Sequence, residues 1–260
     1  MVKIKSQTFE ESVIMAMDGS DKELFPYMPY ILQDLWEMGS DPDTIITLIN
    51  KNLLKHEDLK VLDLGCGKGA VSIRVADKFK CQYRGIDAIE DFILYARIKA
   101  IEYKVDELCL FEVGDIRESI KKLPRYDVII LGSIGPVFGD YQNTLTTLKK
   151  HLNENGIIII DDAYIEDESE FSHPLVLKHK ELIKQINACG LRLVETVSSR
   201  KENVADMSNT IHEKVKKRCF ELADLHPDKK KLFMDFISLQ EYQIDIYTNK
   251  VICSTFVIKK

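Results

Sequence analysis

The residues best suited to chemistry lie in one short segment, 61–70, which reads VLDLGCGKGA. The pattern predicts a strand, a tight turn with glycines at 65, 67 and 69, and the start of a helix. Glycine adopts positive φ angles and lets a ligand approach the backbone, and the free N–H groups of a helix N-terminus point toward such a ligand. Asp63, at the strand end, would suit a ligand with a positive amine. The segment therefore predicts a site for a small polar molecule.

Two more carboxylates follow later strands. Asp87 closes the run Gly85-Ile86-Asp87, twenty residues beyond Gly67, where it could accept two hydrogen bonds from a ribose diol. Asp115 lies in the run VGDI at 113–116, where it could accept from the amino group of an adenine while Ile116 packs on the ring. Open α/β sheets bind ligands beyond the carboxyl ends of their strands, so we expect these side chains at one edge of a sheet.

The elements that must position them follow from the alternation of short β-branched runs with longer amphipathic stretches. The apolar runs are typical of strands covered on both faces, and the alternation predicts parallel strands in an open, doubly wound α/β sheet. Strands are expected at 60–64, 82–86, 108–113, 126–131 and 157–161. Helices are expected between them at about 69–79, 89–103, 139–152 and 174–188.

Two regions depart from this alternation. Residues 1–57 are expected to form an N-terminal helical lid or cap with helices near 22–38 and 42–55, the second capped by Ser40 or Asp41. A strand at 191–197 is followed by a helical insertion at 200–246, with a possible break at 226–228. A last strand at 251–258 should pair antiparallel beside the fifth. The main domain is therefore predicted to comprise 58–199 and 247–260.

Two cofactors compete for the glycine turn. Gly65-x-Gly67-x-x-Ala70 satisfies the dinucleotide fingerprint, and Asp87 would suit a nicotinamide dinucleotide equally well. The acid at 63, however, would place a like charge near a pyrophosphate. It suits a cofactor with an amino-acid moiety and a sulfonium better.

At this level of detail the chain resembles the class I, Rossmann-like S-adenosylmethionine-dependent methyltransferases. The resemblance covers about 60–165 and rests on VLDLGCGKGA, GID at 85–87, VGDI at 113–116, YDVIILGSIGP at 126–136 and GIIIIDD at 156–162. It implies a seven-stranded, mostly parallel sheet whose antiparallel last strand lies between the fifth and sixth, and S-adenosyl-L-methionine as the cofactor. The implied contacts are Asp63, Gly65, Gly67 and Gly69 at the methionine part, Asp87 at the ribose, Asp115 and Ile116 at the adenine, and Gly132 and Ser133 beneath the sulfonium and methyl. Cys66 and Ala88 complete the predicted cofactor-binding set.

Methyl transfer from a sulfonium is an in-line displacement, to which the protein contributes mainly alignment and desolvation. A general base is needed only where the nucleophile must lose a proton. Candidates follow the fifth strand at Asp161, Asp162 and Tyr164, and the predicted catalytic residues are Asp162 and Tyr164. Aromatic side chains of the N-terminal region could fold over the cofactor as a lid or pack as core: Tyr27, Tyr30 and Trp36.

Composition and motifs limit the kinds of molecule that the protein is expected to bind or act on. The formal net charge of -6 disfavours a phosphate polymer, and the loop at 131–136 reads LGSIGP, not the Asn/Asp-Pro-Pro-aromatic loop of amino-methylating DNA enzymes. Scattered cysteines and histidines fit no metal template. No apolar run has the length of a signal peptide or a membrane span. We therefore expect a cytoplasmic enzyme that acts on a small molecule without metal, nucleic acid or membrane, and a homodimer stays open as its assembly.

Two other functions stay open at this point. One is a nicotinamide-dependent oxidoreductase, and the other is a non-catalytic scaffold that binds the cofactor and works through a partner.

Overall fold

The structure, a computed structural model, describes residues 8–260, so the start of the predicted 1–57 region lies outside the described residues. The chain divides into two compact units. The sheet unit comprises Trp36–Asp162, His179–Val197 and Ser254–Lys260. Of the described residues, the helical unit comprises 8–35, Ala163–Lys178 and Ser198–Cys253.

One seven-stranded sheet organises the described residues, in the order β3-β2-β1-β4-β5-β7-β6. The strands β1 to β5 run parallel, and β7 pairs antiparallel between β5 and β6. This confirms the predicted fold class and the place of the last strand. The strands are β1 (Lys60–Leu64), β2 (Gln82–Asp87), β3 (Cys109–Val113), β4 (Tyr126–Gly132), β5 (Leu152–Tyr164), β6 (Arg192–Ser198) and β7 (Ile252–Lys259).

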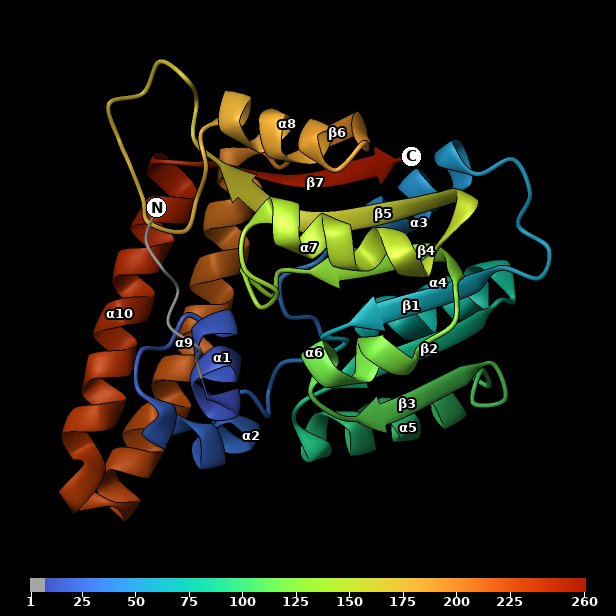
Figure 1. Ribbon diagram of the computed structural model, residues 1–260. Coiled ribbons are helices and arrows are strands. Elements are labelled where there is room, and N and C mark those ends of the chain that lie inside the picture. The colour runs from blue at the N-terminus through green and yellow to red at the C-terminus, as the bar shows by residue number, and fades with distance from the viewer. Residues whose placement is uncertain (1–7) are drawn as a thin grey trace. The chain divides into compact units, whose positions relative to one another are not determined.

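Helices cover both faces of the sheet (Figure 1). One face carries α3 (Pro42–Asn52), α4 (Ala70–Phe79) and α5 (Glu90–Glu102), and the other carries α6 (Ile116–Ser119), α7 (Tyr141–Leu148) and α8 (His179–Ala188). Short 3-10 turns follow α6 and α7 at Ile120–Lys122 and Lys149–His151. Asp41 caps α3 through hydrogen bonds from the amides of Asp43 and Thr44, as one of the two predicted caps.

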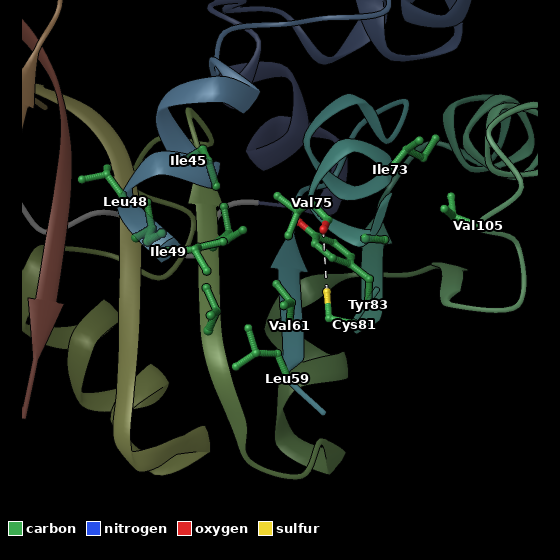
Figure 2. Packing of buried hydrophobic residues seen from close by; sticks show 14 of the residues in the cluster. Ile45, Leu48, Ile49, Leu59, Val61, Ile73, Val75, Cys81, Tyr83 and Val105 are labelled. Atoms are coloured by element: carbon green, nitrogen blue, oxygen red, sulfur yellow. Dashed lines mark hydrogen bonds between the residues drawn. The ribbon is translucent and has the colours of Figure 1, made fainter. Parts of the chain in front are cut away.

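The core beneath α3, α4 and α5 is aliphatic. Ile45, Leu48 and Ile49 of α3 pack in one buried cluster with strand residues such as Val61 and Tyr83 (Figure 2). Because these side chains lose nearly all contact with water, they hold the helices and strands at fixed spacing. The carboxyl ends of β1 and β2 are positioned by this core.

The helical unit contains α1 (Phe9–Ala16), a 3-10 helix (Lys22–Tyr27), α2 (Met28–Ile31), α9 (Lys201–Leu225), a 3-10 turn (Pro227–Lys229) and α10 (Lys230–Asn249). The break between the two long helices falls where it was predicted. Within this unit the Arg218 guanidinium donates to both oxygens of Asp34, at 2.6 and 2.8 Å. Tyr30 donates to Glu221 at 2.8 Å, and Tyr27 packs edge-on against Phe233. Tyr27 and Tyr30 therefore pack within the helical unit.

The prediction of a single helix at 22–38 is wrong. Pro26 and Pro29 lack the N–H that an α-helix needs and crowd the preceding turn, so the chain forms a 3-10 helix and a single α-turn there. Helix α1 was not predicted, although Thr8 and Glu11 form a capping box at its start. Within residues 8–260, no helix is both long and apolar enough to cross a bilayer.

Candidate functional site

The glycine turn between β1 and α4 is held in shape by the protein itself. The glycines at 65, 67 and 69 have φ angles of 80°, 54° and 77°, which other residues rarely adopt. The amides of Gly65 and Cys66 donate to the carbonyl of Ile86 at 2.8 and 3.1 Å, and Gly69 donates to Cys66 at 3.0 Å. The turn is therefore formed before any ligand arrives, and we call residues 65–69 the glycine bend.

Asp87 closes the bend from the neighbouring strand. Its Oδ2 accepts from the Gly67 amide at 2.8 Å, and its Oδ1 accepts from the Ile89 amide at 2.9 Å. Burial raises the pKa of Asp87, while backbone hydrogen bonds from Ile89, Gly67 and Ala88 lower it. The prediction that Asp87 lies beside the bend at the end of the second strand agrees with this geometry.

Asp63 lies under the bend and is only 3% exposed. Its Oδ2 accepts from the hydroxyls of Ser72 and Tyr83, both at 3.0 Å. Burial raises the pKa of Asp63 to about 7, against the two hydroxyl donors that lower it. The carboxyls of Asp87 and Asp161 raise it further.

Cys66 turns its thiol inward. A Cβ on Gly85 would lie 2.8 Å from the Cys66 Sγ, so the thiol fills the space that Gly85 leaves. Burial raises the pKa of Cys66 well above its usual value, and the thiol is neutral. Cys66 can therefore contact a ligand through its backbone and fill space with its side chain, but its thiol does not act as a nucleophile.

Side chains from two other segments contact the bend. A Cβ on Gly65 would collide with Ile134 Cγ2, and one on Gly67 would lie 2.8 Å from Met38 Cε. The Trp36 indole donates to the carbonyl of Lys68 at 3.1 Å. Trp36 thus contacts the predicted cofactor loop, as one of the three aromatic residues considered for a lid.

The Lys68 side chain is buried with a relative exposure of 4%. Its Nζ lies over the rings of Phe92 and Tyr95, at 5.3 and 5.2 Å from their centroids. Aromatic faces stabilise a desolvated ammonium in this arrangement. The lysine of the GCGKG run therefore extends toward α5.

Asp115 caps the short helix α6. It accepts from the Arg117 amide at 2.9 Å, and both of its oxygens accept from the Arg117 guanidinium. Burial raises the pKa of Asp115, but the hydrogen bonds and charge of Arg117 outweigh it and hold that pKa below its usual value. Ile116 is buried next to it. The predicted adenine contact would have to share the carboxylate with this arginine.

The ends of β4 and β5 form the next part of the rim. Gly132 pairs with Asp161 in the parallel ladder, and the Ser133 amide donates to the Asp161 carbonyl at 3.2 Å. Ser133 has a φ of 55°, uncommon for a residue with a side chain. Burial raises the pKa of Asp161, partly offset by the hydroxyls of Ser40 and Thr255. Asp161 Oδ2 and Ser40 Oγ are both buried and make no well-formed hydrogen bond in the described structure.

The two predicted catalytic residues fall at the end of β5. Asp162 Oδ2 accepts from the Tyr141 hydroxyl at 2.7 Å. Burial, together with the charge of Asp162, raises the pKa of Tyr141 well above its usual value, so this hydroxyl stays protonated. Tyr164 is the last residue of the strand and belongs to the helical unit. Their catalytic roles stay predictions.

Comparisons with known proteins decide between the candidate families. A family model described as a methyltransferase domain matches residues 55–231, a range that includes the glycine bend, Asp87, Asp115 and Asp162. The chain belongs to this methyltransferase family.

The names of relatives of the methyltransferase say that these relatives act on different molecules. The malonyl-[acyl-carrier protein] O-methyltransferase of Bacillus cytotoxicus is 31% identical over 44% of this chain and 39% of that protein. The tRNA U34 carboxymethyltransferase of Campylobacter jejuni is 30% identical over 58% of this chain and 52% of that protein. The chain spans about half the length of the curated relatives it matches. A SAM-dependent methyltransferase from Geobacter sulfurreducens, crystallised with S-adenosyl-L-homocysteine, has a TM-score of 0.73 at 18% identity, over 90% of this chain and 97% of that chain.

The family prediction is therefore confirmed, and S-adenosylmethionine is the cofactor that goes with it. The oxidoreductase and scaffold alternatives have no support. The residues of the methyltransferase fit this cofactor, because the bend carries one buried carboxyl, Asp63, beneath it and a second, Asp87, hydrogen-bonded to its Gly67 amide. In the described part of the chain, no group of three or more His, Cys, Asp or Glu is arranged to hold a metal ion.

Sequence reasoning missed Met38, Ser40 and Ile134. They come from the connection before α3 and the loop after β4, and meet the bend or the strand ends only in the folded methyltransferase. Their only sequence signal is position, since Ile134 directly follows two residues predicted to contact the cofactor. Neither Met38 nor Ser40 carries a motif.

Proposed function

We propose that the methyltransferase binds S-adenosylmethionine on the glycine bend and transfers its methyl group to a small molecule by in-line displacement. The observation that carries the proposal is the preformed bend with one buried carboxyl beneath it and another across from it. Asp63 suits the amino-acid end of the cofactor and Asp87 its ribose. Both belong to the segment that the family model matches.

Bound S-adenosylmethionine supplies a methyl group already activated on a sulfonium. The chain therefore has to orient the reactants and exclude water, more than it has to generate a nucleophile. In the proposal the bend and Asp87 hold the nucleoside and amino-acid ends, while Gly132 and Ser133 form the floor beneath the methyl. The hydrogen bond that the Ser133 amide donates to the Asp161 carbonyl holds Ser133 in place for this task.

A proton acceptor is needed when the acceptor atom is a hydroxyl or an ammonium. We propose Asp162 and Tyr164 for this role, because they lie at the end of β5, at the edge where open sheets bind ligands. Asp162 would work with the Tyr141 hydroxyl bound to it, which keeps the carboxylate in one orientation.

A small molecule is favoured as acceptor over a nucleic acid. The net charge of -6 repels phosphate polymers. The helical unit has two short basic runs, at 214–218 and 229–231, and ion pairs with acidic side chains offset part of their charge. Examples are Arg218 with Asp34, Lys229 with Glu23 and Lys231 with Asp235. The tRNA-modifying relative makes nucleic acid the alternative to test. A cytoplasmic location and a homodimer remain part of the proposal.

The experiment has two stages. Calorimetric titration with S-adenosylhomocysteine and with NAD tests the cofactor, and tight binding of NAD alone would overturn the proposal. A metabolite panel with total tRNA as an added arm is then assayed for release of S-adenosylhomocysteine. Release with a small molecule supports the proposed acceptor class, whereas release only with tRNA contradicts it.

A further inference from the structure

The two hydrogen bonds to the Asp63 carboxyl fall on a single oxygen. Tyr83 of β2 and Ser72 in the first turn of α4 each donate a hydroxyl hydrogen to Oδ2 at 3.0 Å. Tyr83 is 2% exposed and Ser72 is fully buried. Two donors on one oxygen favour the charged form of a carboxyl. The rest of the surroundings works against that form.

No basic side chain in residues 8–260 forms an ion pair with Asp63. The nearby titratable groups are Asp87, Asp161, Cys66 and Tyr83, none of them cationic, and the closest carboxyls repel a charge on Asp63. Lys68, only five positions away, has its ammonium over two aromatic rings instead. An anion at position 63 is thus solvated by two hydroxyls and lacks a counter-charge. Such a buried charge is costly until a cation is supplied.

We propose that Tyr83 and Ser72 are positioning residues that keep Asp63 anionic beneath the glycine bend, so that its charge selects the ammonium-bearing end of the cofactor. The inference rests on the proposed function and deepens it. Asp87 serves the ribose of the nucleoside, whereas the buried triad of Asp63, Ser72 and Tyr83 serves the amino-acid part together with the glycine bend. Recognition of the two parts is therefore separable.

Ionisation of Asp63 makes the selection depend on pH. The pKa of Asp63 is raised to about 7 by burial, and a bound ammonium lowers it because the cation stabilises the carboxylate. By linkage, affinity for an ammonium-bearing ligand rises as the pH increases toward 7 and levels off above it. Removal of one hydroxyl donor raises the pKa of Asp63 further. The increase in affinity for the ammonium-bearing ligand then occurs at higher pH.

The test compares two ligands over a pH series. S-Adenosylhomocysteine carries the amino-acid part, and 5′-methylthioadenosine keeps the nucleoside and sulfur but lacks it. Both are titrated calorimetrically into wild type, Tyr83→Phe, Ser72→Ala and Asp63→Asn. Dividing each variant's affinity by that of wild type cancels titration of the ligand itself, and the second ligand reports on Asp87, Asp161 and other groups near the nucleoside.

The expected result is a loss of affinity that is confined to S-adenosylhomocysteine and to low pH. Tyr83→Phe should lower the affinity for S-adenosylhomocysteine about three- to tenfold near pH 6.5. By about pH 8.5 its affinity should equal that of wild type. Binding of 5′-methylthioadenosine should stay within about twofold of wild type throughout. Asp63→Asn should remove the pH-dependent preference for S-adenosylhomocysteine.

Other outcomes overturn the inference. An equal loss for both ligands, or a deficit that is constant with pH, would assign the hydroxyls a purely structural role. If Tyr83→Phe does not fold, Ser72→Ala answers the same question, since it removes the other donor to Oδ2. Absence of binding of either ligand to wild type would instead refute the proposed function, which is a different observation from binding without the pH shift.

Discussion

The carboxylate of Asp87 accepts a hydrogen bond from the backbone amide of Gly67 at 2.8 Å, across twenty positions of sequence. The contact ties the end of β2 to the middle of the glycine bend. It gives Asp87 two tasks, because the side chain proposed to bind the ribose also fixes the loop that is proposed to bind the rest of the cofactor.

Replacement of Asp87 by alanine should weaken binding of S-adenosylhomocysteine by about 1.5–3 kcal/mol, the scale of hydrogen bonds to a charged group. Calorimetric titration measures the loss. Asp91→Ala is the matched control, since it removes the same charge from an exposed position of α5 and should leave affinity unchanged. A loss below about 0.5 kcal/mol for Asp87→Ala would rule out its role at the ribose.

Gly67→Val should abolish cofactor binding while the chain still folds. Gly67 has a φ of 54°, and a Cβ there would lie 2.8 Å from Met38 Cε, over the surface that the cofactor needs. Backbone strain should cost about 1–2 kcal/mol of unfolding free energy. Gly135→Val is the control, because Gly135 also has a positive φ of 62° but nothing lies within 4 Å of its Cβ position. If Gly67→Val binds the cofactor with normal affinity, the glycine bend does not have the proposed role in cofactor binding.

Asp63 should make the protein more stable in mild acid relative to Asp63→Asn. Its pKa is about 7 in the folded protein, against an ordinary value of 3.8 for an aspartate exposed to water, so the folded state binds the extra proton between these values. The stabilisation is therefore fully present below about pH 4 and is lost as the pH rises through 7. Urea unfolding of both proteins at a series of pH values measures the difference. A gap independent of pH, or one that grows toward alkaline pH, would contradict the raised pKa.

Asp162→Asn should lower kcat by about a hundredfold with an acceptor found in the metabolite panel, the range expected when a general base is lost. Affinity for S-adenosylhomocysteine should not change, because the proposed role of Asp162 concerns the acceptor. Tyr141→Phe, which keeps the carboxylate but removes its hydrogen bond, should have a smaller effect. Unchanged kcat in Asp162→Asn would rule out the proposed role of this carboxylate as a general base.

The sheet and the glycine bend were predictable because their signals are local. The run from Val61 to Ala70 contains a strand, its turn residues and a helix start in ten consecutive positions, and β4 and β5 each contain a continuous apolar run. Strand β1 accordingly has the predicted bounds. The inserted place of β7 followed from the family resemblance, since no periodicity encodes which strands become neighbours.

Contacts between distant segments were not predictable from pattern. The bond between the Trp36 indole and the Lys68 carbonyl joins residues that share no motif, and Met38 meets Gly67 only after α3 packs beside α4. The N-terminal region misled the prediction for a different reason. Its apolar residues have helical spacing, but two prolines within four residues override that spacing.

The position of β7 has a consequence for assembly of the protein. The strand that separates β5 from β6 starts at Ile252, whereas β5 ends at Tyr164 and β6 at Ser198. Until the ribosome has released this late strand, β5 and β6 each expose an unpaired edge, the kind of surface that recruits other chains. Nascent chains stalled before Ile252 should therefore depend on chaperones, and the methyltransferase should acquire its final sheet only after synthesis reaches Lys259.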